Sequence, residues 1–224
     1  MAMPHFYNEI KKLNHMLLNL SNMTAKMVNE AIDAIEQHNI PLAQQIIQQD
    51  REIDRLEVEL EEECLKILAL YQPVARDLRF VIAALKINND LERIGDLATN
   101  IAERTVDLAK SAASNPFLRF SEMAEATSKM VQDSISAFIA QDLQLARHVM
   151  ACDDKVDEMN DQAFIRIKKA LIDSPEHVES YLHYLAIPRY LERIADHATN
   201  IAEDIIYMLE GGIERHHLHS EEEN

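Results

Sequence analysis

A polar helical motif occurs twice in this chain, and the repeat limits what the chain can fold into. Residues 91–103 read LERIGDLATNIAE and residues 191–203 read LERIADHATNIAE, with 11 of 13 positions identical. A second block, residues 24–54, aligns without gaps on residues 127–157, and 10 of its 31 positions are identical. Two similar blocks in the same order indicate an internal duplication, so the halves should fold as two similar units rather than as a short-period solenoid.

The spacing of helix-breaking residues predicts the kind of unit. The 224 residues include only 3 Gly and 6 Pro, and a chain rich in helix formers and poor in breakers is typical of all-α proteins. We expect Pro73 and Pro175 to occupy the first turn of the helices that follow them. The breaks separate six long helical segments and lie at Pro41, Pro73, Ser111–Pro116, Gln141–Asp142, Ser174–Pro175 and Gly211–Gly212.

The predicted fold is therefore all-α, with two tandem three-helix bundles related by the duplication. Helices of about 30 residues are about 45 Å long, and they must lie side by side to bury their apolar stripes. We place the first three-helix repeat at residues 1–112 and the second at residues 113–212. Residues 213–224 are expected to form a flexible tail.

Composition excludes several classes of function. The formal net charge of -17 disfavours binding to nucleic acids, which are polyanions. The two cysteines, Cys64 and Cys152, cannot form a disulfide framework and fit a reducing cytosol. The chain lacks an apolar run long enough to span a bilayer, and its first residues turn polar too quickly for a signal peptide. We expect a cytoplasmic protein that reaches the inner face of a membrane only through partners and does not insert directly.

The repeated motif places its polar residues on one face of a helix. At about 100° per residue, these side chains fall within an arc of about 100°, and the apolar residues face the core. Exposed polar residues normally diverge after duplication, so their retention indicates a constraint other than folding. The polar face comprises Glu92, Asp96, Thr99, Asn100 and Glu103, and again Glu192, Asp196, Thr199, Asn200 and Glu203.

Aspartates on the preceding helix of each half add to this face. Carboxylates at positions i and i+4 are neighbours that repel each other unless a cation lies between them. Four carboxylates from two adjoining helices would form an oxygen-rich site for a hard divalent cation or a multinuclear iron or zinc cluster. The candidate metal ligands are Asp50, Asp54, Glu92 and Asp96 in the first half, and Asp153, Asp157, Glu192 and Asp196 in the second.

Three neighbouring features of the motif have structural interpretations. Arg93 and Arg193 are expected to form salt bridges that support the acidic face. Gly95 and Ala195 keep one position small, which indicates a close approach of another helix. Pro188 lies inside the last helix, where a proline usually causes a kink, so the second site is expected to be tilted relative to the first.

The halves also differ at the start of their third helix. The sequence ARDLR, residues 75–79, has no counterpart in the second half, where EHVES occupies residues 176–180. Any partner contact through this segment should be one-sided, although these residues can equally be ordinary polar residues of the first helical turns. The side chains concerned are Arg76, Asp77 and Arg79.

These residues resemble the PhoU family over nearly the whole chain, most closely in the run PVARDLRFVIAALKINNDLERIGD at residues 73–96. The resemblance implies a cytoplasmic, all-helical negative regulator of phosphate uptake and of the phosphate-starvation regulon. It implies that the chain links the ATPase subunit of a phosphate ABC transporter to a membrane sensor histidine kinase, and that it forms a homodimer. It also implies metal clusters bound through the (E/D)xxxD motifs, with the eight carboxylates above as ligands. Secondary candidates are Asn100, Glu103, Asn200 and Glu203.

Two other functions remain open at this stage. One is a metal-independent helical interaction module whose acidic face meets a basic partner. The other is a di-iron ferroxidase-type enzyme, but that chemistry requires inward-facing Glu-x-x-His pairs on two helices. Neither motif helix carries such a pair, so we expect no enzymatic activity and no catalytic residues.

Overall fold

The computed structural model describes residues 3–110 and 118–211, which form six α-helices and one short 3-10 turn. The all-α fold class is thus confirmed, and the tail predicted at residues 213–224 lies outside the described residues. The helices are α1 (Met3–Glu36), α2 (Ile40–Tyr71), α3 (Ala75–Leu108), α4 (Ser121–Ala140), α5 (Leu143–Asp173) and α6 (Val178–Glu210), with the 3-10 turn η1 (Pro175–His177) before α6.

The connection between the first two helices of each half reverses the chain in the same way. His38 and Gln141 occupy equivalent positions and both adopt left-handed backbone angles, with φ of 52° and 53°. The next residue caps the following helix: Asn39 Oδ1 accepts a hydrogen bond from Leu42 N at 3.1 Å, and Asp142 Oδ1 accepts one from Gln144 N at 2.9 Å. Such side-chain caps satisfy amide groups that have no partner within the helix, so both halves begin with a tight antiparallel helix pair.

The turns between α2 and α3 and between α5 and α6 differ from the prediction at their prolines. Gln72 closes α2 in a left-handed conformation, Val74 is extended, and α3 begins only at Ala75. Pro73 therefore precedes the helix instead of opening it, because the chain needs the intervening residues to reverse direction. Pro175 opens η1, and α6 begins three residues later at Val178.

The last helix runs from Val178 to Glu210 without a break at Pro188, which is buried inside it. Its end matches the prediction: Gly211 has φ of 72° and donates its backbone N–H to Tyr207 O at 2.9 Å. This left-handed position is one that glycine adopts without a steric penalty.

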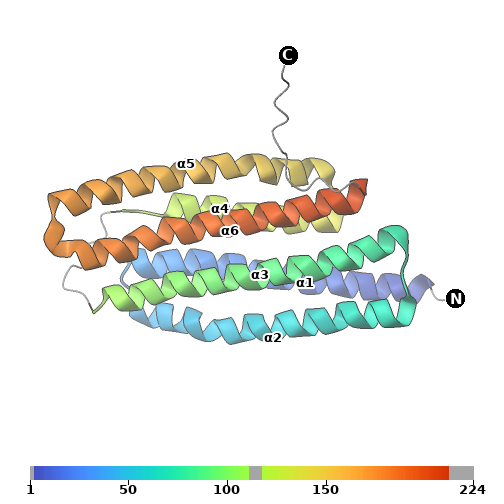
Figure 1. Cartoon of the computed structure of the whole chain (residues 1–224). Coiled ribbons are helices and arrows are strands. Elements are labelled where there is room, and N and C mark those ends of the chain that lie inside the picture. Colours follow the sequence, from blue (N-terminus) through green and yellow to red (C-terminus); the bar gives the residue numbers. More distant parts are fainter. Residues whose placement is uncertain (1–2, 111–117, 212–224) are drawn as a thin grey trace, which may run out of the picture.

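The six helices form two bundles that lie side by side (Figure 1). Helices α1, α2 and α3 pack together as the first repeat, and α4, α5 and α6 pack together as the second. The repeats meet through α1 against α4 and α3 against α6, whereas α2 and α5 contact only helices of their own repeat within the described residues. Figure 1 accordingly shows α2 and α5 on opposite outer sides of the molecule.

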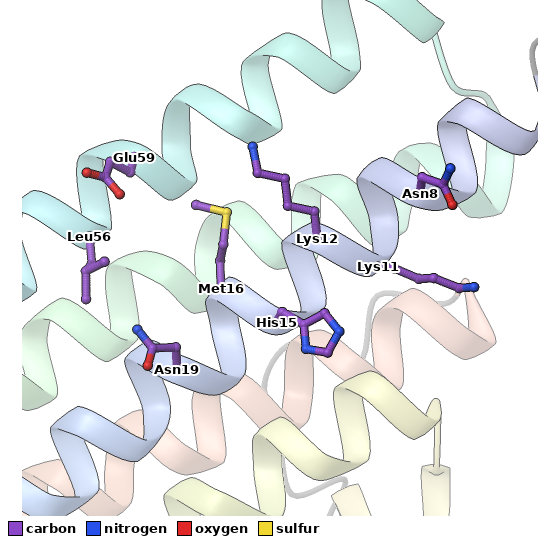
Figure 2. Close-up of a pocket in the computed structure, with 8 residues that line it drawn as sticks. All are labelled: Asn8, Lys11, Lys12, His15, Met16, Asn19, Leu56 and Glu59. Atoms are coloured by element: carbon purple, nitrogen blue, oxygen red, sulfur yellow. The ribbon is translucent and has the colours of Figure 1, made fainter.

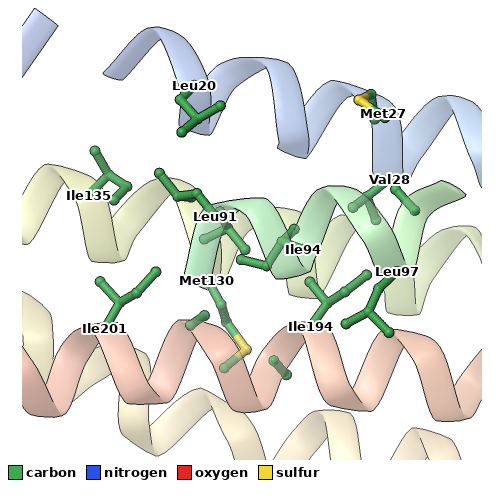
Figure 3. Close-up of a cluster of buried hydrophobic side chains, with 14 of the residues drawn as sticks. Leu20, Met27, Val28, Leu91, Ile94, Leu97, Met130, Ile135, Ile194 and Ile201 are labelled. Atoms are coloured by element: carbon green, nitrogen blue, oxygen red, sulfur yellow. The ribbon is translucent and has the colours of Figure 1, made fainter. Parts of the chain in front are cut away.

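The core runs through the junction of the repeats (Figure 3). The apolar side of the repeated motif points into it, with Leu91 and Ile94 from α3 and Ile194 and Ile201 from α6 fully buried. Each large aliphatic side chain buried in this way stabilises the fold by about 1.5–3 kcal/mol. The apolar face of the motif is thus where its periodicity predicted, and α2 packs against α3 and α5 against α6 beside the polar face.

Polar contacts fix the register between the repeats. Asp90 Oδ1 on α3 lies 2.8 Å from His197 Nδ1 on α6, and Lys86 Nζ donates to Asp204 Oδ1 at 2.6 Å. At the other helix pair, the Glu36 carboxylate at the end of α1 accepts from the backbone N–H groups that begin α4, at 2.7 and 3.1 Å. One repeat therefore caps a helix of the other, and the motif helices are held in a defined antiparallel arrangement.

Candidate metal centres

The first acidic cluster comprises Asp50, Asp54, Glu92 and Asp96, and it lies along the contact of α2 with α3. Close packing of the two helices places it there, because a Cβ atom built on Gly95 would lie 3.1 Å from Ile53 Cγ2. The prediction that this position is small for a close helix approach is confirmed. Asp50, Glu92 and Asp96 are half-buried, and Asp54 is exposed.

Burial and mutual repulsion raise the pKa values of Asp50 and Glu92 in the first acidic cluster. Burial raises the pKa of Asp50, a hydrogen bond from Thr99 Oγ1 to Asp50 Oδ1 at 3.1 Å lowers it, and the charges of Asp54 and Asp96 raise it. Burial also raises the pKa of Glu92, together with the charge of Asp96. The carboxylates of the two helices therefore face one another closely enough to disfavour full ionisation.

The second acidic cluster comprises Asp153, Asp157, Glu192 and Asp196, and it lies along the contact of α5 with α6. Burial, followed by the charges of Asp157 and Asp196, raises the pKa of Asp153 to about 6. Asp153 Oδ1 is inaccessible to solvent and accepts no hydrogen bond from the part of the chain that the structure describes. A buried carboxylate oxygen without a donor is costly, so this cluster is the more strained of the two.

Burial and neighbouring charges also act on Asp157 and Glu192 of the second acidic cluster. The pKa of Asp157 is raised by burial and then by the charge of Asp196. The pKa of Glu192 is raised by burial, lowered by Arg189, and raised by Asp196 and Asp157. Both helices thus contribute carboxylates to a single negatively charged cluster.

The supporting arginines are not the symmetric pair that the sequence predicted. Arg93 Nη1 lies 3.2 Å from Asp96 Oδ2, as expected for the first motif. Arg193 makes no ion pair within residues 3–110 and 118–211. Arg189 takes its place, with Nη1 at 2.8 and 3.1 Å from the two oxygens of Glu192. The cause is local, because Arg189 precedes Glu192 by one helical turn and its first-half counterpart is Asn89, which carries no charge.

Neither cluster holds a ready-made coordination site. Among the described residues, no three His, Cys, Asp or Glu side chains converge closely enough to hold a metal ion. The chemistry of the donor set nevertheless fits a hard cation, since it consists of carboxylate oxygens from two helices and includes the unpartnered Asp153 Oδ1. Binding of an ion would require the side chains to rotate toward one another.

Thr99 faces the first acidic cluster, as the helical projection predicted, and its hydroxyl donates to Asp50. Its burial was not expected, because the polar face was predicted to be exposed. Of the secondary candidates, Glu103 acts on the first cluster, where its charge raises the pKa of Asp50. Within the described residues, Asn100, Asn200 and Glu203 make no hydrogen bond to a cluster carboxylate. The repetition of the threonine in both motifs was a signal for Thr99, although the partner could not be read from it.

The ARDLR segment, residues 75–79, contacts the second repeat. Arg76 Nη2 donates to the side-chain oxygen of Gln141, and Arg79 Nε donates to Met208 O at 3.1 Å. Both arginines tie the start of α3 to the second repeat. Asp77 remains exposed.

A groove of about 480 Å³ between α1 and α2 was not predicted from the sequence. Figure 2 shows Lys12 and Met16 of α1 on one side and Leu56 and Glu59 of α2 on the other. Two of the charged groups at this groove have partners, because Lys12 pairs with Glu63 and Glu59 pairs with Arg55. The groove lies apart from both acidic clusters, and we assign no ligand to it.

The sequence profile described as the PhoU domain matches residues 17–105 and again residues 120–205. The chain belongs to the PhoU family. It is 37% identical over 210 residues to a phosphate-specific transport system accessory protein PhoU homolog from Aquifex aeolicus, covering 94% of this chain and 95% of that protein. It is 36% identical over 208 residues to PhoU homolog 1 from Thermotoga maritima, covering 92% and 90%.

Solved PhoU structures have the same fold. The crystal structure of PhoU from Pseudomonas aeruginosa matches with a TM-score of 0.85 and 36% identity over 92% of this chain and 100% of that one. The phosphate transport system regulatory protein PhoU from Streptococcus pneumoniae matches with a TM-score of 0.85 and 27% identity, over 94% and 100%. The six-helix arrangement of Figure 1 is therefore the PhoU fold.

None of the helices formed by residues 3–110 and 118–211 is long and apolar enough to cross a membrane.

Proposed function

We propose that this chain is an accessory protein of a phosphate-specific transport system and acts as a negative regulator of phosphate uptake, without enzymatic activity. The observation that carries the proposal is the family match over both repeats, shared with relatives that bear the name of transport-system accessory protein. The related protein from Streptococcus pneumoniae is named a regulatory protein of phosphate transport.

We further propose that the chain is a cytoplasmic, metal-binding adaptor between the transporter ATPase subunit and a sensor histidine kinase, and that it works as a homodimer. The arrangement of the acidic clusters supports an adaptor. One cluster lies beside α2 and the other beside α5, and these helices occupy opposite outer sides of the molecule (Figure 1). Two similar surfaces that face different directions suit a protein that contacts two partners at once.

A cation at either cluster would be held by its four carboxylates, namely Asp50, Asp54, Glu92 and Asp96 or Asp153, Asp157, Glu192 and Asp196. The bound ion would supply the positive charge that offsets their repulsion. The protein contributes the position of the carboxylates on packed helices and, in the first cluster, the Thr99 hydroxyl that orients Asp50. A divalent cation or a multinuclear iron or zinc cluster would suit these oxygen donors.

The metal proposal is tested by elemental mass spectrometry on untagged protein, purified anaerobically with iron and zinc offered at low excess. The test variant is Glu92→Ala/Asp96→Ala/Glu192→Ala/Asp196→Ala. A control with the same loss of charge removes four exposed carboxylates outside the clusters, Glu61→Ala/Glu62→Ala/Glu122→Ala/Glu125→Ala. We expect the wild type and the control to retain metal and the folded test variant to lose it. If all three proteins are empty, or all retain the same metal, the ligand assignment fails.

A metal-independent docking surface is the second candidate function, and the lack of three converging ligands among the described residues favours it. In that case the complex with the transporter ATPase subunit should form equally well with and without chelator. Charge reversal at Glu92 and Asp96 should then weaken the complex, and its affinity should fall with added salt.

A further inference from the structure

The first repeat carries a further carboxylate and a buried amide directly beside the first acidic cluster. The carboxylate is that of Glu57 on α2, and the amide is that of Asn88 on α3. Neither residue is repeated, because the equivalent positions of the second half are Asn160 and Pro188. Asn160 carries no charge and Pro188 has no polar side chain, so any role of the Glu57–Asn88 pair is confined to the first repeat.

The Asn88 side chain is fully buried, and only its nitrogen has a partner. Asn88 Nδ2 donates to the backbone oxygen of Glu57 at 2.9 Å and lies 3.3 Å from Glu57 Oε1. Asn88 Oδ1 is inaccessible to solvent and accepts no hydrogen bond within residues 3–110 and 118–211. A buried amide oxygen without a donor is costly to the fold. This oxygen is therefore available to bind a ligand beside the Glu57 carboxylate.

A second carboxylate, that of Glu92, lies next to the same amide. Asn88 precedes Glu92 by four residues, so the two side chains are neighbours on one face of α3. Burial is the largest of the influences that raise the pKa of Glu92, and the charge of Glu57 is among them. Burial also raises the pKa of Glu57, followed by the charges of Glu61 and Asp54. Glu57 and Glu92 therefore approach each other from the two helices.

We propose that Glu57, Glu92 and Asn88 Oδ1 bind a hard divalent cation at an additional position of the first acidic cluster. Oxygen atoms of carboxylates and side-chain amides are the ligands that such cations prefer. A water molecule could donate to two of these oxygens, but only a cation also offsets the repulsion between the carboxylates. The inference rests on the proposed metal binding and deepens it, because it gives the first repeat a ligand set that the second repeat lacks.

The cationic side chains nearby leave this position accessible. Glu57 forms no ion pair in the part of the chain that the structure describes, and Arg55 on the same helix is already engaged by two other glutamates. Arg93 Nε lies 3.4 Å from Glu92 Oε2, but the arginine side chain is mostly exposed and such a contact is weak. Two carboxylates and one amide are also compatible with the finding that no three His, Cys, Asp or Glu side chains converge among the described residues.

The experiment is a titration with Mn²⁺ alone, followed by the electron paramagnetic resonance signal of the free ion. The parent protein is the full chain with Asp153→Asn/Asp157→Asn/Glu192→Gln/Asp196→Asn, so that only the cluster of the first repeat can bind. Glu57→Gln and Asn88→Ala, each made in this parent, should weaken the binding of one Mn²⁺ ion at least about tenfold. Asn88→Ala removes no charge, so its effect separates the loss of a ligand from a change in net charge.

The matched control is Glu61→Gln in the same parent. Glu61 is exposed on α2 one turn beyond Glu57, and its charge acts on Glu57. The control therefore removes the same charge from the same helix without removing a proposed ligand, and it should change the Mn²⁺ affinity less than about threefold. Circular dichroism confirms that the variants are folded. If Asn88→Ala does not fold, the comparison of Glu57→Gln with Glu61→Gln decides.

The outcomes separate this inference from the proposed metal binding. If the parent binds Mn²⁺ and Glu92→Ala/Asp96→Ala abolishes the binding, but Glu57→Gln has no larger effect than Glu61→Gln, the additional position is overturned and the metal cluster stands. An Mn²⁺ affinity that is unchanged in folded Asn88→Ala would remove the amide from the ligand set and overturn the position as well. A parent that binds no Mn²⁺ would contradict both the additional position and the metal binding of the first repeat.

Discussion

In the first acidic cluster the innermost aspartate, Asp50, accepts a hydrogen bond from Thr99 at 3.1 Å. Its counterpart in the second acidic cluster, Asp153, has a buried oxygen without a donor among the described residues. Thr199 occupies the position equivalent to Thr99, but its hydroxyl donates to the backbone oxygen of Asp196 at 2.7 Å. Two motifs that are nearly identical in sequence therefore leave their aspartates in different electrostatic states.

The arginines extend this difference. Arg93 pairs with both Asp96 and Glu92 in the first cluster, at 3.2 and 3.4 Å, whereas Arg189, from one turn earlier, pairs with Glu192 in the second. A cation that binds either cluster must compete with an arginine, which is shared between two carboxylates in the first cluster and engages one in the second. The comparison teaches that the repeated residues define which carboxylates form each cluster, while side-chain geometry and unrepeated neighbours such as Arg189 determine how well each carboxylate is satisfied.

Removal of the threonine hydroxyls gives the largest expected difference between the clusters. Thr99→Val should lower the free energy of unfolding by about 1.5 kcal/mol, because it deletes a hydrogen bond to a charged group and leaves Asp50 with less compensation. Thr199→Val should change it by less than about 0.5 kcal/mol, since that hydroxyl contacts only the backbone of its own helix. The measurement is urea denaturation at pH 7 in chelator, so that bound metal does not contribute. Equal losses in the two variants would remove the distinction between the clusters.

The second prediction concerns the pH dependence of stability. The pKa of Asp153 is raised from 3.8 to about 6 in the folded protein, so the folded state binds a proton more readily than the unfolded state. The contribution of Asp153 to stability therefore falls as pH rises from about 4 to about 6, and its penalty is fully present at pH 7. Asp153→Asn should raise the free energy of unfolding at pH 7 by about 1 kcal/mol, a value reduced for partial solvent exposure.

The matched variant for this test is Asp50→Asn, measured by urea denaturation in chelator at pH 4.5, 6 and 7.5. It should give a smaller gain, because the carboxylate of Asp50 already receives the Thr99 hydrogen bond. The advantage of Asp153→Asn over the wild type should shrink toward pH 4.5, where the wild-type carboxyl becomes protonated. An advantage that stays constant with pH would show that burial of Asp153 does not govern its ionisation.

Much of the architecture could be predicted because it depends on periodicity. The apolar side of each motif, such as Leu91 and Ile194, is buried as predicted, since residues on one helical face share one environment. The long helices and their end at Gly211 followed from the sparse breakers for the same reason. These features are local, so a single sequence contains the information that specifies them.

Contacts between distant residues could not be predicted in this way. Glu36 caps α4 across 84 residues of sequence, and Arg79 reaches the backbone of Met208. Thr99 turned out to be buried because α2 packs close to α3 at that point, and the exchange of Arg193 for Arg189 depends on side-chain geometry. Such partners are set by the packing of helices, which the helical projection of one segment does not contain.

The smallest expected effect tests how closely the helices approach behind the first acidic cluster. In the first repeat, Gly95 on α3 faces Ile53 on α2. The equivalent positions in the second repeat are Ala195 and Val156. Gly95→Ala alone should gain less than the usual 1 kcal/mol or so of a glycine-to-alanine change in a helix, because the new Cβ would lie 3.1 Å from Ile53 Cγ2. Ile53→Val removes one methyl group and gives the side chain room to move aside.

Gly95→Ala/Ile53→Val reproduces the pair of the second repeat, and we expect it to be more stable than the sum of the single changes predicts, by about 0.5 kcal/mol. Urea denaturation of the wild type, both single variants and the double variant gives this coupling energy directly. The Ile53→Val change by itself should cost about 1 kcal/mol, as for other buried isoleucines. If the effects of the two changes are additive, Ile53 already moves aside for the methyl group introduced by Gly95→Ala. Packing against Ile53 would then not be the reason for a small residue in the first motif.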